Sequence, residues 1–542
     1  MYPDYVHALL SKDIYIENVD DILLEQTHLS YVFINDIYVY KIKKSVDFDF
    51  VKQSKLSQRK KFCLQEIEQN KRLAPKVYIK VVKIVLNIKS QYAIREGKIF
   101  KGDKIVEYAV KMHRLDLNNN LETILKNNNL PENFSKIFVD KIFSFHQKAV
   151  KFSGSKKTGG YLAEKNWCID EMKQQKNHIN FTISESLLKK ITAYLNNFLL
   201  KNQAVFDLRL KEKNIIFGHG DLQIKHVYLE NFFKSSKITV DDLLVIDCIE
   251  FSNLFHFKFI DKGYDIAFLT MGMDYSHNPQ IADEICGHYV ALTGDKYFGI
   301  LHNYHKILRA LIRAKVEGIA AKSDIIDKLA RKKYKQQSKI FFQLVKKYIE
   351  IPSDPLVIVV GGFSASGKST FAGALASRLG AAYVSSDVIR KKMFNVDIHH
   401  RPSKSITQKM YNSNVTVQVY SKLLKEASML MKQNFSVVID AAYLLKSERD
   451  ITNQFIQESS LPSFFLWLDA SENVINSRVK ARTSTQLKIS DANIGIINKQ
   501  FKSFEKINEN EKIYIINNNK TMYNSFLQVS KISKLLKDKI IF

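Results

Sequence analysis

Short apolar runs separated by turn residues characterise the N-terminal part of the chain. Tyr31–Phe33 and Tyr38–Ile42 are strand-like runs on either side of Asn35-Asp36, which predicts a β-hairpin. Lys61–Leu73 has the apolar spacing of a helix, and Tyr108–Met112 predicts a further strand. The pattern therefore indicates a small β-rich lobe with one helix.

The pattern changes to helical spacing farther along the chain. The segment from Leu121 to about Leu210 is mostly helical, and Ile281–Val345 is helical again. Between them, Ile215–Phe217 and Leu243–Ile246 predict two short strands that flank an acidic site. A helical lobe is therefore expected to follow the β-rich lobe.

The clearest domain boundary lies at Ile351-Pro352-Ser353-Asp354-Pro355, because two close prolines stop a helix and favour an extended linker. Before it, Lys322–Glu350 predicts one long basic helix. After it, Leu356–Val360 predicts a buried strand that runs into glycines. We therefore expect a first domain at residues 1–347 and a separate α/β domain at residues 348–542.

Composition places the chain among multidomain globular proteins. Its 542 residues suit two or three domains, and 45% are hydrophobic, which is enough for sizeable cores. No apolar run approaches the roughly 20 residues of a membrane-spanning helix, and Met1–Asp20 lacks a signal-peptide pattern. The four cysteines are widely spaced, which predicts free buried thiols. We expect a cytoplasmic protein with no membrane partner.

The charge balance is strongly basic. Lys and Arg total 82 against 55 Asp and Glu, a formal net charge of +27. Such a balance is compatible with nucleic acid or highly phosphorylated substrates. The lysines are spread along the chain rather than gathered in one block, so the charge alone makes RNA a possible partner but does not favour it. The partner that we expect is a small hydroxyl-bearing molecule.

The strongest motif is a phosphate-binding loop. Gly362–Ser369 fits G-x-x-x-x-G-K-[ST], follows a predicted strand and opens a predicted helix. Lys368 would supply charge at the β- and γ-phosphates, Ser369 would present its hydroxyl to Mg²⁺, and the helix from Thr370 would add its dipole. The residues expected to bind ATP here are Gly362, Ser364, Ala365, Ser366, Gly367, Lys368, Ser369 and Thr370.

Further candidates follow this loop in order. Asp387 comes after a short predicted strand, Ala381–Val384, and could orient an acceptor hydroxyl or take its proton; the alternative is a helix N-cap. Asp440 ends the apolar strand Val437–Ile439 and has the pattern of an acid that holds Mg²⁺. Arg478 and Arg482 share one helical face and could close over the phosphates, although a solvated helix face has the same spacing.

The N-terminal part carries a second constellation. Asp221, in His219-Gly220-Asp221-Leu222, and Asp247 each follow a short predicted strand. Phosphoryl transfer uses one acid to orient and deprotonate the acceptor and another to hold Mg²⁺. A strand lysine, Lys41, with a helix glutamate, Glu66, would grip the phosphates of ATP. Lys43 and Lys44 are alternatives to Lys41.

The C-terminal motifs resemble the small P-loop kinases that include gluconate, shikimate and 5′-hydroxyl polynucleotide kinases. The matching stretches are Gly362–Thr370, Ser386–Lys391, Ile439-Asp440-Ala441 and Arg478-x-x-x-Arg482. This resemblance implies that Asp387 is the acceptor-side acid and Arg390 a substrate-side cation. It does not select the acceptor, because the same framework phosphorylates sugars, acids and RNA ends.

The N-terminal motifs resemble the aminoglycoside-phosphotransferase branch of the protein-kinase-like fold, and bacterial proteins that fuse such a domain to a P-loop kinase. The matching stretches are Val39–Lys44, Val46–Phe48, Phe62–Glu66, Asn70–Pro75, Ala109–Met112, His219–Leu222, Asp247–Phe251 and Asp265–Leu269. The resemblance implies Asp221 as catalytic base, Asp247 as Mg²⁺ ligand and Met112 at the adenine hinge. Gln223 and His226 stand where that pattern has His and a metal-binding Asn, so His226 becomes a candidate ligand.

Taken together, the sequence predicts mixed α/β and α+β architecture, with a bilobal protein-kinase-like domain followed by a P-loop domain with a parallel sheet. The predicted function is ATP- and Mg²⁺-dependent phosphoryl transfer to a hydroxyl acceptor, with two nucleotide sites. Two alternatives stay open. The P-loop domain could phosphorylate 5′-hydroxyl RNA, or the N-terminal domain could be catalytically degenerate and regulate the P-loop domain.

Overall fold

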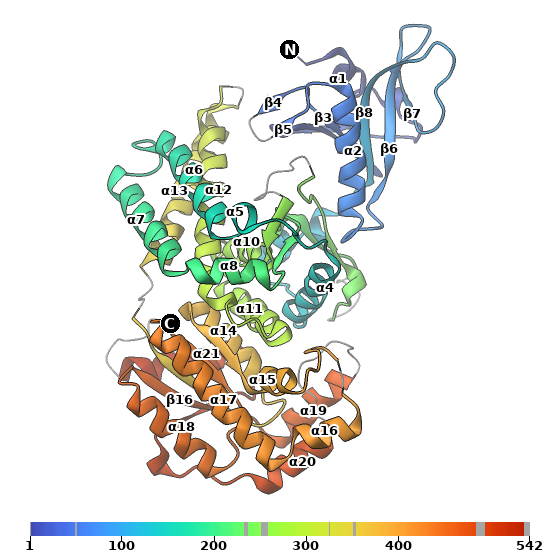
Figure 1. The fold of residues 1–542 in the computed structure, drawn as a ribbon. Helices are drawn as coiled ribbons and strands as arrows, with labels where there is room; N and C mark the ends of the chain where they lie inside the picture. Colours follow the sequence, from blue (N-terminus) through green and yellow to red (C-terminus); the bar gives the residue numbers. More distant parts are fainter. Residues whose placement is uncertain are drawn as a thin grey trace. The chain divides into compact units, whose positions relative to one another are not determined.

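A computed structural model describes residues 2–48, 51–231, 237–250, 258–324, 326–350, 354–400, 402–483 and 494–535 of the chain (Figure 1). Contacts between Cα atoms divide it into two compact units. The first unit comprises Met1–Ile137, Ser144–Ala163 and Asp207–Asp265, and the second comprises Phe138–Phe143, Glu164–Phe206 and Ile266–Phe542. The predicted division at residues 347 and 348 stays a prediction, and most of the predicted linker lies outside the described residues.

The first unit is built on a six-stranded antiparallel sheet with the order β1-β2-β3-β8-β6-β7. One long helix, α2 (Leu56–Asn70), lies against β8 and β6 (Figure 1). The predicted hairpin and the predicted strand at Tyr108–Met112 are confirmed. The strands are β1 (Leu23–Gln26), β2 (Ser30–Ile34), β3 (Tyr38–Lys43), β6 (Tyr78–Leu86), β7 (Tyr92–Arg95) and β8 (Lys104–His113).

Alternation along β3 decides which of its side chains reach α2. Successive strand residues point to opposite faces of a sheet. Tyr40 and Ile42 belong to the core cluster on one face, and Val39 packs with the cluster on the other face, which includes Cys63 of α2. Lys41 and Lys43 share the face of Val39. The strand therefore directs two lysines, two residues apart, toward the same helix.

Two short antiparallel strand pairs precede the acidic residues of the first unit. β9 (Ile215–Phe217) pairs with β12 (Phe259–Asp261), and β10 (Val227–Leu229) pairs with β11 (Leu243–Val245). The segment from Gly218 to His226 connects β9 to β10 and ends in the short 3-10 helix η4 (Ile224–His226). The predicted strands at Ile215–Phe217 and Leu243–Ile246 are thus confirmed, and each leads into its acidic residue.

The second unit contains a five-stranded parallel sheet with the order β14-β15-β13-β16-β17. Its central strand, β13, is buried along its whole length, as expected for a parallel strand covered on both faces. The bounds are β13 (Val357–Gly361), β14 (Ala382–Ser385), β15 (Val437–Asp440), β16 (Ser463–Asp469) and β17 (Ile513–Asn517). These findings confirm the predicted fold class.

Helices of the second unit pack closely on the helix that follows the phosphate-binding loop. This helix, α14 (Lys368–Leu379), contacts α11 (Pro279–Thr293) and α12 (Phe298–Lys322). A Cβ on Gly287 of α11 would lie 2.3 Å from the main-chain oxygen of Thr370. The absence of that side chain is what lets the two helices approach each other so closely.

The prediction of one long helix at Lys322–Glu350 is wrong at its N-terminal end. α12 ends at Lys322, and a separate helix, α13, spans Lys328–Ile349. The side chain of Asp327 accepts hydrogen bonds from the main-chain N–H groups of Leu329 and Ala330. This N-cap satisfies orphan donors and starts a new helix there. Within the described residues, no helix combines the length and apolar character that a membrane span requires.

Candidate active sites

The predicted pairing of a strand lysine with a helix glutamate is present in the first unit. Lys41 Nζ of β3 lies 2.9 Å from Glu66 Oε1 of α2 and 2.6 Å from Asp247 Oδ1. Burial disfavours the ammonium, but the charges of Asp247 and Glu66 outweigh it and raise the pKa of Lys41. Burial likewise opposes ionisation of Glu66, yet the two nearby lysines lower its pKa. Both groups are therefore charged at neutral pH.

A second lysine shares the same glutamate. Lys43 Nζ lies 2.6 Å from Glu66 Oε2 and also contacts Glu250. The sequence left Lys41, Lys43 and Lys44 as alternatives, and the structure brings the first two to Glu66. Lys44 instead donates to the main-chain oxygen of Thr27 at 2.5 Å. Lys41 and Lys43 share one face of β3, whereas Lys44 lies just after the strand ends.

Asp221 lies in the segment between β9 and β10, and its carboxylate is held by a neighbour. The Gln223 amide donates from Nε2 to Asp221 Oδ1 at 2.8 Å and to Oδ2 at 2.9 Å. Gly220, at φ +83°, allows the chain to turn sharply just before the carboxylate. Gln223 therefore fixes the orientation of the residue that resemblance implies as the catalytic base.

Asp265, in the first turn of α10 (Lys262–Tyr275), binds the main chain of the segment that carries Asp221. Its carboxylate accepts main-chain hydrogen bonds from His219 at 2.8 Å and Gly220 at 2.9 Å. Burial alone would raise the pKa of Asp265, but His146 and these donors lower it to about 2. His219 donates from Nε2 to the Ile246 carbonyl at 3.0 Å, and burial lowers its pKa to about 4. A neutral imidazole thereby ties the two acid-bearing segments together.

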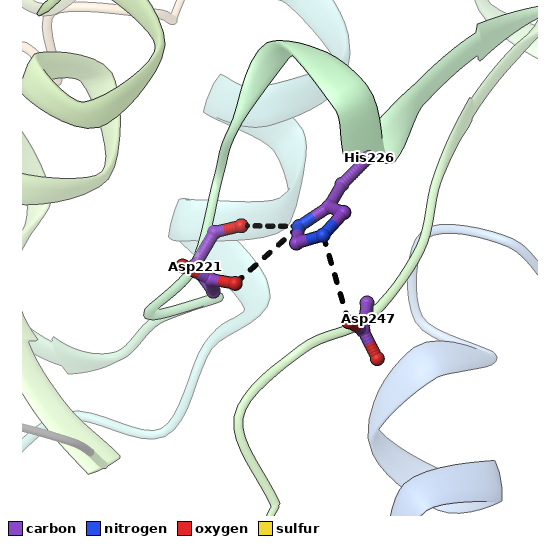
Figure 2. Close-up of side chains that lie close together, drawn as sticks. All are labelled: Asp221, His226 and Asp247. Atoms are coloured by element: carbon purple, nitrogen blue, oxygen red, sulfur yellow. Dashed lines mark hydrogen bonds and ion pairs between the residues drawn. The ribbon is translucent and has the colours of Figure 1, made fainter. Parts of the chain in front are cut away.

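The two acidic segments meet at His226, as Figure 2 shows. His226 Nδ1 lies 2.8 Å from the main-chain oxygen of Asp221, and its Nε2 lies 3.5 Å from Asp247 Oδ2. Asp247 has φ +65°, a backbone conformation that an aspartate adopts at some cost. Burial would raise the pKa of Asp247, but the charge of the nearby Lys41 ammonium holds it well below its usual range. Asp247 is therefore ionised at neutral pH.

The implied Mg²⁺ site of the first unit fits only in part. Asp221, His226 and Asp247 each offer one donor atom, and these atoms lie within 4.8 Å of one another. The carboxylates are oxygen donors of the kind that Mg²⁺ prefers, but His226 presents a nitrogen. Met112, which was expected to lie at the adenine hinge, is buried near the end of β8 in the cluster that also contains Tyr108.

The phosphate-binding loop of the second unit connects β13 to α14, as its motif predicts. Gly362 at φ +145° and Gly367 at φ +97° adopt backbone conformations that favour glycine, and Ala365 is at φ +64°. Lys368 is the first residue of α14 and is 8% exposed. A loop of this shape at a helix N-terminus has the geometry that suits an anion-binding site.

Three side chains from later in the chain hold this loop. Arg478 donates from Nη1, and Asn518 donates from Nδ2, to the main-chain oxygen of Ser366, each at 2.7 Å. Gln500 accepts from the main-chain N–H of Ser364 at 2.9 Å. Arg478 was predicted to close over the phosphates, and the structure places it beside the loop. Its predicted partner, Arg482, has a side chain that lies outside the described residues.

Asp440 and Ser369 provide the oxygen donors that a Mg²⁺ site needs. Asp440 is buried at the end of β15, and its Oδ2 accepts a hydrogen bond from the Tyr383 hydroxyl at 2.6 Å. Burial raises the pKa of Asp440, while Lys368 and the hydroxyls of Tyr383 and Ser369 oppose the rise. Its Oδ1 has no hydrogen-bond partner among the described residues. A hard cation would satisfy that buried oxygen, so these residues fit Mg²⁺.

The two acceptor-side candidates are close in sequence but differ in environment. Asp387 lies in the first turn of α15 (Ser386–Met393), whose N-cap is Ser385, so Asp387 is not itself the cap. Arg390 is buried, and its Nη1 donates to the Met410 carbonyl at 2.6 Å. In this structure Arg390 supports the neighbouring chain, and its role toward substrate stays a prediction.

Sequence reasoning gave no role to several residues that the structure brings to these sites. In the first unit they are Asp265, Glu250 and Gln223, and in the second they are Tyr383, Gln500 and Asn518. The strand period could have placed Lys43, and with it an acidic partner, next to Glu66. Gln500 and Asn518 contact main-chain atoms of the loop, and such contacts leave no motif in the sequence.

Comparison with known proteins finds one matching family model and several relatives. Residues 357–507 match a family model described as an AAA domain. An uncharacterized protein of Mycobacterium tuberculosis is 22% identical over 466 residues, which cover 85% of this chain and 86% of that protein. An uncharacterized protein of Mycobacterium bovis matches with the same values.

Solved structures of several kinases are similar to part of the chain. A gluconokinase from Sinorhizobium meliloti is 18% identical, with 34% of this chain and 96% of that chain covered and a TM-score of 0.25. A choline/ethanolamine kinase family protein from Mesorhizobium loti is 10% identical, with 64% and 95% covered and a TM-score of 0.38. An aminoglycoside 2′-phosphotransferase-IIIa is 12% identical, with 63% and 98% covered and a TM-score of 0.33.

The family match and the loop geometry confirm the predicted P-loop domain. The Lys41–Glu66 pair and the two acids of the first unit, together with this domain, agree with the predicted class of enzyme, an ATP-dependent kinase.

Proposed function

We propose that the chain is a two-site phosphotransferase, in which each unit moves the γ-phosphoryl group of ATP to a hydroxyl acceptor. One observation carries this proposal. Lys41, Glu66, Asp221 and Asp247 come from four separate segments and meet in one site, while the second unit carries a complete phosphate-binding loop. Kinase chemistry needs such positioned charges and little covalent help from the protein.

In the first unit, the acceptor hydroxyl would be oriented by Asp221. Its oxygen would form a bond to the γ-phosphorus as the bond from that phosphorus to the β-bridging oxygen breaks, and its proton would pass to the Asp221 carboxylate. Lys41, held by Glu66, would bind the phosphates that remain on ADP. A divalent ion bound at Asp247 supplies neutralisation of the phosphate charge.

In the second unit, the main-chain N–H groups of the loop and Lys368 would hold the phosphates. Asp387 would orient the second acceptor hydroxyl and take its proton, and Arg478 would neutralise the charge that develops on the transferred group. Asp440 and Ser369 would hold Mg²⁺. The nucleotide would thus be held mainly by main-chain groups here and mainly by side chains in the first unit.

The acceptor is proposed to be a small hydroxyl-bearing molecule, and the reaction to take place in the cytoplasm. All four cysteines are free and buried, as suits a reducing compartment. A net charge of +27 supports a second candidate, transfer by the P-loop domain to the 5′-hydroxyl of RNA. Salt-sensitive binding of RNA would favour this candidate over a small acceptor.

A regulatory first unit is a third candidate. Its support is that the acidic groups already have partners, since Gln223 holds both oxygens of Asp221 and Lys41 holds Asp247. A unit of this kind would bind nucleotide and transfer nothing. The P-loop domain would then be the only catalytic part.

The test is transfer of labelled γ-phosphate from ATP to aminoglycosides, sugars, small hydroxy acids, nucleosides and 5′-hydroxyl RNA. Wild type is compared with Asp221→Asn and Lys368→Ala. The two-site proposal expects one product lost only in Asp221→Asn and another lost only in Lys368→Ala. If every product survives Asp221→Asn and disappears in Lys368→Ala, the first unit is regulatory and the two-site proposal fails.

A further inference from the structure

The candidate metal ligands of the first unit include a nitrogen donor, His226, whose ring orientation is fixed by a hydrogen bond. His226 is 7% exposed, and its Nδ1 lies 2.8 Å from the main-chain oxygen of Asp221. A carbonyl oxygen can only accept, so Nδ1 carries the hydrogen. The lone pair of Nε2 is then left for the other side of the ring, where Asp247 lies (Figure 2).

The Nε2 lone pair and Asp247 Oδ2 are two acceptors that face each other, and the space between them suits a cation, while Lys41 occupies the other oxygen, Oδ1. His226 Nε2 and Asp247 Oδ2 are 3.5 Å apart, which is longer than a good hydrogen bond from an imidazolium to a carboxylate. Two ligands at about 2.1 Å from one ion, at a tetrahedral angle, lie about 3.4 Å apart. The separation therefore suits a shared ion better than a shared proton.

The surroundings of the ring are those of a metal ligand. Histidines that bind metals commonly donate their other ring N–H to a carbonyl or carboxylate, which fixes the ring orientation, and Nδ1 of His226 does this. Asp221 is a less suitable ligand, because Gln223 donates to both of its oxygens. The ligand pair is therefore His226 Nε2 with Asp247 Oδ2.

We propose that this site binds a first-row divalent transition-metal ion in preference to Mg²⁺, with His226 Nε2 as a direct ligand. Imidazole suits such ions, whereas Mg²⁺ favours oxygen donors and gives up its water reluctantly. The inference rests on the proposed function only in that the ion would serve the nucleotide of the first unit. The P-loop site differs, since its expected ligands, Asp440 and Ser369, are both oxygen donors.

The test uses Mn²⁺ alone as the probe, because its electron spin detects a bound nitrogen nucleus. The full chain carrying Asp440→Asn, which disables the other expected metal site, is compared with the same chain carrying His226→Asn or His28→Asn. His28 is an exposed histidine of the first unit and serves as the matched control. We expect nitrogen coupling to bound Mn²⁺ in the parent and in His28→Asn, and its loss in His226→Asn.

Competition with Mg²⁺ gives the second readout. In His226→Asn, the Mg²⁺ concentration that displaces half of the Mn²⁺ should fall at least about tenfold relative to the parent, since the imidazole nitrogen is replaced by an amide oxygen, the kind of donor that Mg²⁺ favours. Bound Mn²⁺ without nitrogen coupling in the parent, or equal displacement by Mg²⁺ in both chains, overturns the inference. Nitrogen coupling in a chain whose first unit phosphorylates no acceptor would leave the inference standing and defeat the proposed function.

Discussion

The two candidate phosphate sites are built by different means. The first unit uses buried ionised side chains, with Lys41 between Glu66 and Asp247, whereas the second uses the main chain of a glycine-rich loop at the start of α14. A site of charged side chains depends on every partner, because a buried charge that loses its partner is strongly destabilising. A site of main-chain groups depends instead on backbone shape, so a single methyl group can disrupt it.

The largest effect on phosphoryl transfer is expected from replacing Lys41, which pairs with both Glu66 and Asp247. Lys41→Met should lower phosphoryl transfer by the first unit about 10²–10³-fold, because a cation aimed at the transferring phosphates is removed. Transfer by the second unit should not change. The measurement is the labelled-phosphate assay with each unit's own acceptor.

The matched control is Lys44→Met, which changes a lysine that bonds to Thr27 away from the site. Circular dichroism should first establish that Lys41→Met remains folded, because the change removes a positive charge that neutralises Glu66 and Asp247. Equal losses in Lys41→Met and Lys44→Met would show that position 41 has no special role in transfer.

Acid should affect the first unit more than the second, because buried titratable groups assemble its site. The pKa of His219 is about 4 in the folded chain, against about 6.5 when unfolded. The unfolded state therefore binds more protons between these values, so this contribution to stability is complete above pH 6.5 and is lost as the pH falls toward 4. The full difference is on the order of 3 kcal/mol.

Urea unfolding followed between pH 7 and pH 4 measures this loss. The two tryptophans, Trp167 and Trp467, both lie in the second unit, so their fluorescence reports on that unit, while hydrogen exchange at β9 and β10 reports on the first. His219→Gln should remove much of the pH dependence of exchange in the first unit. An unchanged pH dependence in His219→Gln would assign the acid sensitivity to other groups, such as Asp265.

The loop of the second unit offers the converse test. Gly367 has φ +97°, and a Cβ there would lie 2.5 Å from Asn518 Nδ2, whereas Gly380 of the same segment has φ +63° and open space around it. Gly367→Ala should weaken ATP binding by the second unit about 10–100-fold, which corresponds to roughly 1–3 kcal/mol of strain. Titration calorimetry measures the change.

Gly380→Ala is the control, because it adds a methyl group at positive φ without a clash. It should leave ATP affinity within a few-fold of wild type. If both variants bind ATP equally well, close contact with Asn518 does not determine the shape of the loop.

The difference between the sites also explains what the sequence could predict. The P-loop is contiguous, so its strand, turn and helix appear together in one motif from Gly362 to Thr370. The site of the first unit joins residues from distant segments, and the order of β-strand, helix and acid pointed to it together with a family resemblance. Asp247 and Lys41 could be predicted in this way, but Gln500 and Asn518 could not, because they contact main-chain atoms.

The predicted helix boundary was wrong where a capping residue interrupted a continuous apolar pattern. The apolar and basic pattern across Lys322–Glu350 is continuous, yet α13 begins only after Asp327, whose side chain caps it. An aspartate before a helical run is a recognised start signal and could have corrected the boundary. The register of β3 contained similar information, since it places Lys41 and Lys43 together and Lys44 apart.

The smallest effect is expected at Gln223, which orients a charge without carrying one. Gln223→Met removes both hydrogen bonds to the Asp221 carboxylate, but that group is partly exposed and water can replace the lost donors. Transfer by the first unit should fall roughly 2- to 10-fold, as expected for a net loss of about 0.5–1.5 kcal/mol. The control is Gln91→Met, at an exposed position beside β7. A rise in transfer with Gln223→Met would instead mean that Gln223 restrains Asp221, which is the behaviour expected of a regulatory first unit.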